Sequence, residues 1–114
     1  FADVTLDMLI AQEEVFGPVQ AIVKFSTEAA AIALANSQDH GLAAYIQTGD
    51  PVRADRVARK LDVGMVQVNG NSRLPGAPFG GTKSSGIGRE SGIWGIREYL
   101  EIKSISGAAR QSGT

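Results

Sequence analysis

The stretch from Asp50 to Val68 constrains the fold most, because it specifies a helix, the end of that helix and the strand that follows. Asp50 can accept hydrogen bonds from the first free amides of a helix, and Pro51 suits the first helical position. Four apolar residues recur at helical spacing, which predicts one apolar stripe packed on a sheet: Ala54, Val57, Ala58 and Leu61. Gly64 is predicted to close the helix in the left-handed cap position, and residues 65–68 then form a strand.

Two more strand-like runs and one more helix precede this unit. Residues 19–25 are apolar and rich in β-branched side chains, and residues 43–48 run up to a Gly-Asp turn, so both are predicted strands. Between them, hydroxyl residues, then Glu28, then an alanine-rich body predict a helix over 27–35. This order predicts an α/β fold in which a partial parallel sheet is built by two right-handed βαβ crossovers.

Beyond Val68 the periodicity stops. Residues 69–88 contain two prolines and six glycines, and a loop of this length is typical of a functional segment. Residues 90–100 predict a short amphipathic helix, polar residues alternate with isoleucines over 101–106 as in a half-exposed strand, and 107–114 predict a frayed tail. Because a parallel sheet needs cover on both faces, we expect the chain to belong to something larger or to dock onto another chain.

Composition excludes several classes of protein. The 114 residues include no cysteine, so a disulfide scaffold, a thiolate zinc site, an iron–sulfur cluster and a cysteine nucleophile are excluded within them. The net charge is −1 and the basic residues are scattered, so we expect no nucleic-acid partner. No apolar run approaches the roughly 20 residues that a membrane span needs. We therefore expect a soluble, cytoplasmic protein without a membrane partner.

Two glycine patterns come close to phosphate-binding loops without matching them. Residues 86–92 approach G-x-G-x-x-G, but the third glycine falls one residue late and a loop precedes it. Residues 76–81 have the spacing of the P-loop, but Thr82 stands where that motif needs lysine. His40 is the single histidine, so we predict no metal site and no Ser–His–Asp triad. The glycines therefore predict a surface loop.

Two longer motifs resemble those of one enzyme family. Residues 13–18, Glu-Glu-Val-Phe-Gly-Pro, resemble the E-E-[IV]-F-G-P motif of the aldehyde dehydrogenases. Residues 78–90 resemble that family's P-F-G-G-x-K-x-S-G-x-G-R-E. Shorter segments between the motifs follow the family's order and spacing, at residues 31–36, 41–44 and 68–69. The resemblance covers about residues 1 to 106, nearly the whole chain.

The resemblance implies a fold and an activity. Residues 1–100 would form the C-terminal part of an aldehyde dehydrogenase catalytic domain, and residues 101–114 its oligomerisation strand and tail. The family oxidises an aldehyde to a carboxylic acid with NAD or NADP, through a cysteine thiohemiacetal and thioester. That cysteine and the Rossmann-like domain would lie upstream of Phe1, so we expect the chain alone to be inactive. The alternative is a free-standing, non-catalytic relative that acts in binding or assembly.

Four residues take roles from the resemblance, position by position. Glu14 matches the acid that hydrogen-bonds the nicotinamide ribose, and Phe16 matches the aromatic that packs near the nicotinamide. Phe79 matches a residue that lines the aldehyde channel. Glu90 matches an acid proposed to relay protons in some members, and a structural ion pair is the open alternative. Asn69 and the glycines of residues 80–88 are predicted to be structural.

The loop through which the substrate would enter departs from the family pattern. Residues 70–77 lack the aromatic side chains that many members place there, and they carry Arg73. We predict that Arg73 lines the substrate channel and favours a polar or anionic aldehyde. The resemblance also implies that residues 101–106 associate with a neighbouring subunit, so a homo-oligomer is expected. The aldehyde, the choice between NAD and NADP, and the choice between dimer and tetramer stay open.

Overall fold

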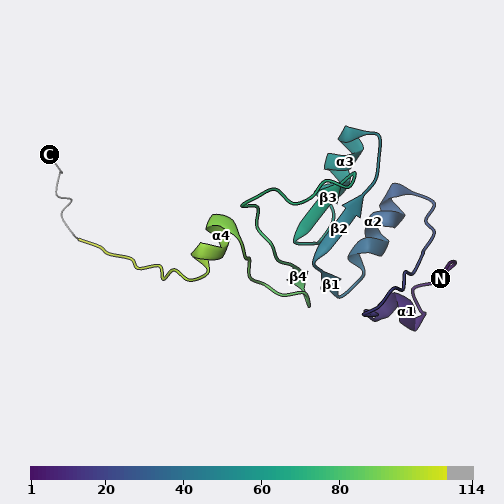
Figure 1. Ribbon diagram of the computed structural model, residues 1–114, viewed down its shortest axis with the longest axis horizontal. Helices are drawn as coiled ribbons and strands as arrows, with labels where there is room; N and C mark the ends of the chain where they lie inside the picture. The colour runs from purple at the N-terminus through teal and green to yellow at the C-terminus, as the bar shows by residue number, and fades with distance from the viewer. Residues whose placement is uncertain (108–114) are drawn as a thin grey trace.

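Residues 1–107, the part of the chain that the computed structural model describes, form four short helices and two separate two-stranded sheets (Figure 1). The elements follow the order α1 (Leu9–Gln12), α2 (Glu28–Asn36), β1 (His40–Gly41), β2 (Ala43–Ile46), α3 (Pro51–Ala58), β3 (Met65–Val68), β4 (Thr82–Lys83) and α4 (Gly92–Arg97). β2 and β3 are parallel, and β1 and β4 are antiparallel. The α/β class is therefore confirmed, with sheets smaller than predicted.

The unit β2–α3–β3 follows the sequence expectation closely. The Asp50 carboxylate accepts hydrogen bonds from two amides of the first turn of α3, at 2.9 and 3.1 Å, and Pro51 occupies the first helical position. Ala54 on the apolar stripe is buried. The two strands pair in register from Ala43 with Met65 to Ile46 with Val68. One strand–helix–strand unit with parallel strands results.

Helix α2 lies beside α3 (Figure 1). The Thr27 hydroxyl accepts a hydrogen bond from the Ala30 amide at 3.1 Å and caps the helix, as predicted from the hydroxyl residues before Glu28. Glu28 then joins the two helices, because both of its carboxylate oxygens accept hydrogen bonds from the Arg56 guanidinium, at 2.9 and 2.7 Å. The two helices share an apolar groove with β2 that has a volume of about 610 Å³.

The predicted strand over residues 19–25 is wrong. This stretch makes three backbone hydrogen bonds with residues 1–4 and joins neither sheet: the terminal amino group donates to Gln20 at 2.8 Å, Ile22 donates to Phe1 at 2.9 Å, and Val4 donates to Ile22 at 3.1 Å. Its β-branched residues favour an extended backbone, but a strand also needs a continuous ladder of partners. The predicted three-stranded parallel sheet with two crossovers is therefore reduced to one parallel pair.

Gly64 does not have the predicted cap role. Helix α3 ends at Ala58, with Arg59 as its right-handed cap residue, because a short turn follows in which Lys60 and Leu61 donate back to Val57 and Ala58. Gly64 lies six residues beyond the end of the helix. It packs against the backbone of Gly80, and this close contact is possible because Gly64 has no side chain.

The C-terminal predictions are met only in part. The helix expected over 90–100 is α4, which is confined to Gly92–Arg97. Residues 101–106 are not a strand in the described part of the chain, because no other segment there offers them backbone hydrogen bonds. Their association with another subunit stays a prediction. The expected frayed tail covers residues 107–114, of which 108–114 lie outside the described residues. The boundary proposed at residue 100 stays a prediction.

The described chain has very little core. Val4 and Ala54 are the only buried apolar side chains among the described residues, while large apolar side chains on α1, β2, α3, α4 and the loops stay exposed. The radius of gyration is 19.8 Å, against about 13 Å for a compact domain of similar length. Within residues 1–107, no helix has the length and apolar character needed to cross a membrane. The shape supports the expectation that further protein covers this chain.

Candidate active site

The second glycine-rich motif folds into a closed loop. Phe79 and Glu90 face each other across an antiparallel bridge, in which the Phe79 amide donates to Glu90 at 2.9 Å and the Glu90 amide donates to Phe79 at 2.7 Å. We call residues 79–90 the glycine loop. The bridge holds the two predicted site residues next to each other although eleven positions separate them in the sequence.

Arg89 ties the glycine loop together from inside. Its Nη1 donates to the carbonyl of Gly81 at 2.6 Å and to that of Gly88 at 2.9 Å. One cation thus satisfies two backbone carbonyls of the loop, those of Gly81 and Gly88. The motif comparison assigned no role to Arg89. A cation within a glycine-rich stretch is the sequence signal that could have found it.

Phe79 and Glu90 border an open groove with a volume of about 840 Å³. The glycine loop forms one side of this groove, and α4 with the two residues that follow it, Glu98 and Tyr99, forms the other. Phe79 is 38% exposed, so part of its ring is free to contact a ligand. The described residues place no cation within ion-pair distance of Glu90, and both the proton relay and the structural ion pair stay predictions.

Arg73 joins this group from the preceding loop. Its guanidinium carbon lies 5.6 Å from the centroid of the Phe79 ring, a cation–π distance, and its Nη1 donates to the Ala77 carbonyl. The structure therefore brings together three of the five predicted site residues: Arg73, Phe79 and Glu90. Arg73 contacts the Phe79 ring but does not itself border the groove of the glycine loop.

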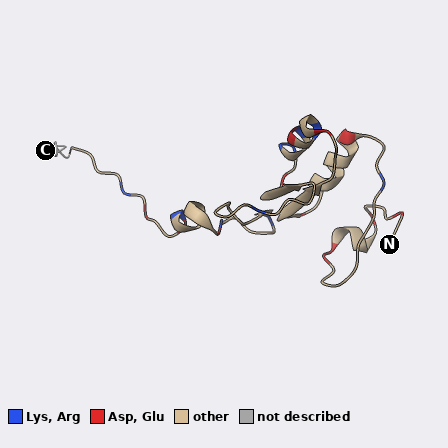
Figure 2. Ribbon diagram, turned by 45° about the horizontal axis from the view of Figure 1, so that its top comes forward, with Lys and Arg blue, Asp and Glu red and all other residues tan. Residues whose placement is uncertain are grey.

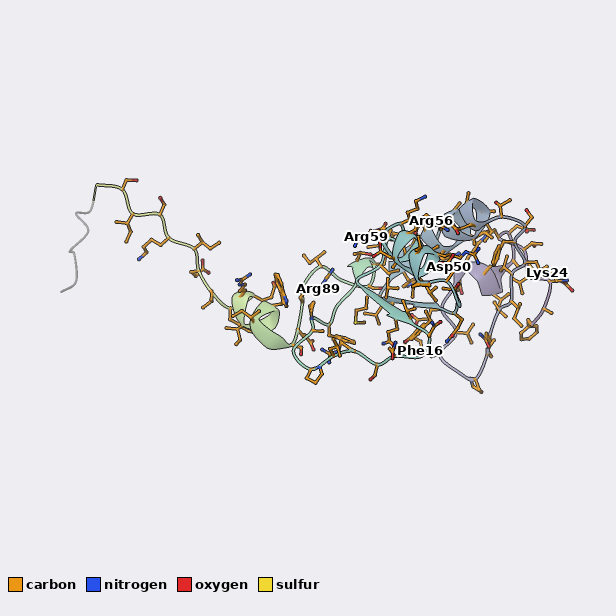
Figure 3. The ribbon with its side chains drawn as sticks, turned by 90° about the horizontal axis from the view of Figure 1, so that it is seen from above. Phe16, Lys24, Asp50, Arg56, Arg59 and Arg89 are labelled. Carbon is orange, nitrogen blue, oxygen red and sulfur yellow. The ribbon has the colours of Figure 1, made fainter. Side chains whose placement is uncertain are left out.

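Glu14 and Phe16 lie apart from that group. Both follow α1 and are exposed, Phe16 to 94%. Neither borders the groove of the glycine loop. All three views place α1 and α4 on opposite sides of the β2–β3 pair, and Figure 3 labels Phe16 on the N-terminal part of the chain and Arg89 just before α4. In the described chain the two predicted cofactor residues and the predicted substrate residues are thus separate.

Two polar side chains connect the elements around the site. The Asn69 side-chain amide donates to the Thr48 carbonyl and accepts from the Thr48 amide, both at 2.9 Å, which extends the β2–β3 pairing beyond its strands. This contact gives Asn69 the structural role predicted for it. Lys83, which the motif comparison left without a role, reaches the C-terminal end of α2, where its Nζ donates to Asn36 and Gln38 at 2.9 and 3.0 Å.

Several carboxyl groups with lowered pKa values lie on or beside the helices, and Figure 2 shows acidic and basic residues gathered on α3. The two hydrogen bonds from Arg56 hold the pKa of the Glu28 carboxyl below its ordinary value. Hydrogen bonds from the Arg53 and Val52 amides lower the pKa of Asp50 in the same way. The side chain of Arg59 lowers the pKa of Asp55. These shifts belong to helix caps and ion pairs away from the groove.

Comparison with known proteins gives one consistent family. The aldehyde dehydrogenase family matches residues 1–105 of the chain. Human mitochondrial succinate-semialdehyde dehydrogenase is 52% identical over 104 residues, which are 90% of this chain and 19% of that protein. A putative aldehyde dehydrogenase of Staphylococcus haemolyticus is 46% identical over 107 residues, 94% of this chain and 22% of that protein.

Solved structures agree with these relatives. A mutant of aldehyde dehydrogenase C from Pseudomonas syringae, solved with NAD⁺ and octanal, superposes with a TM-score of 0.92 and 45% identity, over 98% of this chain and 23% of its own. Aldehyde dehydrogenase from Bartonella henselae superposes with a TM-score of 0.86 and 48% identity, over 89% of this chain and 21% of its own. The chain spans about a fifth of the length of the relatives it matches.

Proposed function

Because the chain belongs to the aldehyde dehydrogenase family, we propose that it forms part of the catalytic domain of an enzyme that oxidises an aldehyde to a carboxylic acid with NAD or NADP. The observation that carries this proposal is the backbone bridge that holds Phe79 and Glu90 side by side on an open groove. Both residues lie at the ends of the longer family motif. The bridge supports the proposal because the motif comparison predicts a catalytic and a substrate contact for the same two residues.

The groove residues can contribute in distinct ways. The Phe79 ring offers an apolar surface that would exclude water from the reacting carbon. The Glu90 carboxylate can accept a proton from a water molecule and release it to solvent, as a proton relay requires. A cysteine nucleophile would come from another part of the enzyme, because these 114 residues contain none. The chain would then shape the site without supplying the nucleophile.

Glu14 and Phe16 would hold the cofactor. A carboxylate has two oxygens that can accept hydrogen bonds from both hydroxyls of a ribose, and Glu14 is exposed and free to do so. Phe16, at 94% exposure, offers a whole aromatic ring for packing. The chemistry of the pair therefore fits a nicotinamide nucleotide. A nucleotide held there would supply the acceptor for a hydride from the substrate.

Arg73 supports an anionic aldehyde as the substrate class. Its guanidinium lies over the Phe79 ring, so a carboxylate on the substrate could pair with Arg73 while the aldehyde end lies along the ring. The human relative, which is named for succinate semialdehyde, acts on an aldehyde of this class by its name. We propose that the substrate carries a negatively charged group distant from the aldehyde carbon.

Residues 101–106 support assembly with another subunit. They are extended and exposed, and Ile102 and Ile105 are 99% and 73% accessible. Unpaired backbone and exposed isoleucines are the features of a strand that lacks its partner. We propose that this segment pairs with a neighbouring copy in a homo-oligomer.

A segment exchange tests the proposed function. In the human relative, the matching segment is replaced by residues 1–105 of this chain, and the product is called the chimaeric enzyme. We expect aldehyde-dependent reduction of NAD or NADP, with no turnover by the isolated chain because it lacks a nucleophile. A chimaeric enzyme that is folded and binds the cofactor but turns over no aldehyde would contradict the proposal and favour a non-catalytic relative.

A further inference from the structure

We propose that Lys83 is a positioning residue that fixes the glycine loop to the C-terminal end of α2, and so sets the place of Phe79 and Glu90 at the groove. The catalytic consequence rests on the proposed function, whereas the attachment itself rests on geometry alone. The Lys83 ammonium donates to the carbonyls of Asn36 and Gln38, at 2.9 and 3.0 Å, and lies 3.3 Å from an Asp62 carboxylate oxygen. Its side chain is only 23% exposed.

The end of α2 needs a cation from elsewhere. The last carbonyls of a helix have no partner within the helix, and the aligned peptide dipoles leave partial negative charge there. Helix α2 has no basic residue in its last turn. Lys83 supplies that positive charge from 47 residues further along the chain. The Lys83 ammonium therefore donates hydrogen bonds to two carbonyls at the end of α2, and its positive charge interacts favourably with the partial negative charge there.

The backbone around Lys83 is shaped for this contact. Lys83 has a φ of +54°, in the left-handed region that non-glycine residues rarely adopt unless their surroundings impose it. It pairs with His40 in the β1–β4 ladder, and the next residue, Ser84, donates to the Asp39 carbonyl at 2.9 Å. The Ser85 hydroxyl also accepts from the Gly41 amide at 3.0 Å. Main chain and side chain thus attach the loop to the same short region, residues 36–41.

The bridge between Phe79 and Glu90 closes the glycine loop. If the contact between the loop and α2 changes, both residues therefore move together. Lys83 lies between them in the sequence and on the side of the loop that meets α2. Without the ammonium, the loop would keep its internal bridge but lose part of its fixed relation to the rest of the chain. Lys83 therefore acts through Phe79 and Glu90 and needs no contact with substrate.

Hydrogen exchange of the 114-residue chain tests the attachment. Lys83→Met keeps most of the length of the side chain and removes its charge. We expect the amides of residues 79–90 to exchange about tenfold faster, while those of β2 and β3 keep their rates. Lys83→Arg should restore slow exchange, and Lys24→Met is the matched control, because Lys24 is an exposed lysine paired with Asp3. Equal acceleration in the loop and in β2–β3, or no acceleration, overturns the attachment.

Kinetics of the chimaeric enzyme test the consequence. We expect Lys83→Met to lower kcat about tenfold with KM changed less than about threefold, because misplacement of a positioning contact acts on the chemical step. Lys83→Arg should recover most of kcat, and Lys24→Met should leave it unchanged. Unchanged kcat despite faster exchange overturns the positioning role. If the unsubstituted chimaeric enzyme has no turnover, the proposed function fails, and the exchange result still decides the attachment.

Discussion

At the scale of single residues, close backbone contacts decide how the glycine loop packs. A Cβ atom placed on Gly64 would lie 1.8 Å from the carbonyl oxygen of Gly80, far inside van der Waals contact. Neither backbone can yield alone, because Gly64 leads into β3 and the Gly80 backbone lies against Gly88 and Arg89. Gly64 therefore sets the distance between the parallel pair and the glycine loop.

Gly64→Ala should lower the free energy of unfolding by about 2 kcal/mol, because overpacking forces the two segments apart. Urea denaturation of the chain measures this loss. Gly49→Ala is the matched control, since a Cβ at Gly49 meets no atom within 4 Å, and it should change stability by less than about 1 kcal/mol. Equal effects of the two substitutions would show that the contact with Gly80 is unimportant.

Arg73 gives a prediction about specificity at the same scale. In the chimaeric enzyme, Arg73→Met should lower kcat/KM for succinate semialdehyde about tenfold relative to neutral butanal, because a charge-assisted contact to the carboxylate is lost. Arg97→Met is the matched control, as its guanidinium carbon lies 5.1 Å from the Trp94 ring centroid in a similar stacked pair. Unchanged relative rates for the two aldehydes would contradict the role of Arg73.

At the scale of elements, the ion pair between α2 and α3 makes their packing depend on pH. Arg56 lowers the pKa of Glu28 in the folded chain. A carboxyl with a lowered folded pKa stabilises the fold above its unfolded pKa of about 4.3, and that contribution disappears as the pH falls through the lowered value. The two helices are thus coupled most firmly near neutral pH.

Glu28→Gln should therefore flatten the loss of stability between about pH 5 and pH 3, because the substituted side chain no longer titrates. Denaturant midpoints measured across this range give the slope. Arg56→Gln should flatten the same range, and the double variant should add little to either single one. A slope unchanged by Glu28→Gln would contradict the coupling.

The sequence predicts elements well where local chemistry decides them. The Asp50 cap, Pro51 and the apolar stripe locate α3, and the β-branched run locates β3 at the observed bounds. Residues 19–25 have similar local preferences but find no ladder, because strand formation depends on distant partners. The two-residue strands β1 and β4 have no detectable periodicity, and only the tertiary contact defines them.

The sequence predicted which residues belong to the candidate site better than it predicted how they are arranged. The motifs name Phe79 and Glu90, yet only the structure shows the bridge between them and the stacking of Arg73 on the Phe79 ring. Arg89 and Lys83 were given no role because their partners are backbone carbonyls, which every residue carries, so the only signal in the sequence is a cation within a glycine-rich stretch.

At the scale of the whole molecule, the exposed isoleucines of residues 101–106 predict assembly. Ile102→Lys in the chimaeric enzyme should shift it toward smaller species, because a charge disrupts strand pairing with a neighbouring subunit. Light scattering after size-exclusion chromatography measures the mass. Lys103→Glu, which changes an existing charge in the same segment, is the comparison. A mass unaffected by Ile102→Lys would exclude this segment from the interface.

The parallel pair β2–β3 is a two-stranded sheet, so within the described residues the outer side of each strand has no neighbour. Whatever protein covers those edges binds the folded form in preference to the unfolded chain, and every tenfold excess of it over its dissociation constant adds about 1.4 kcal/mol to stability. The lifetime of the folded chain in a cell therefore depends on how much partner is present, because copies without a partner spend more time unfolded and are degraded faster.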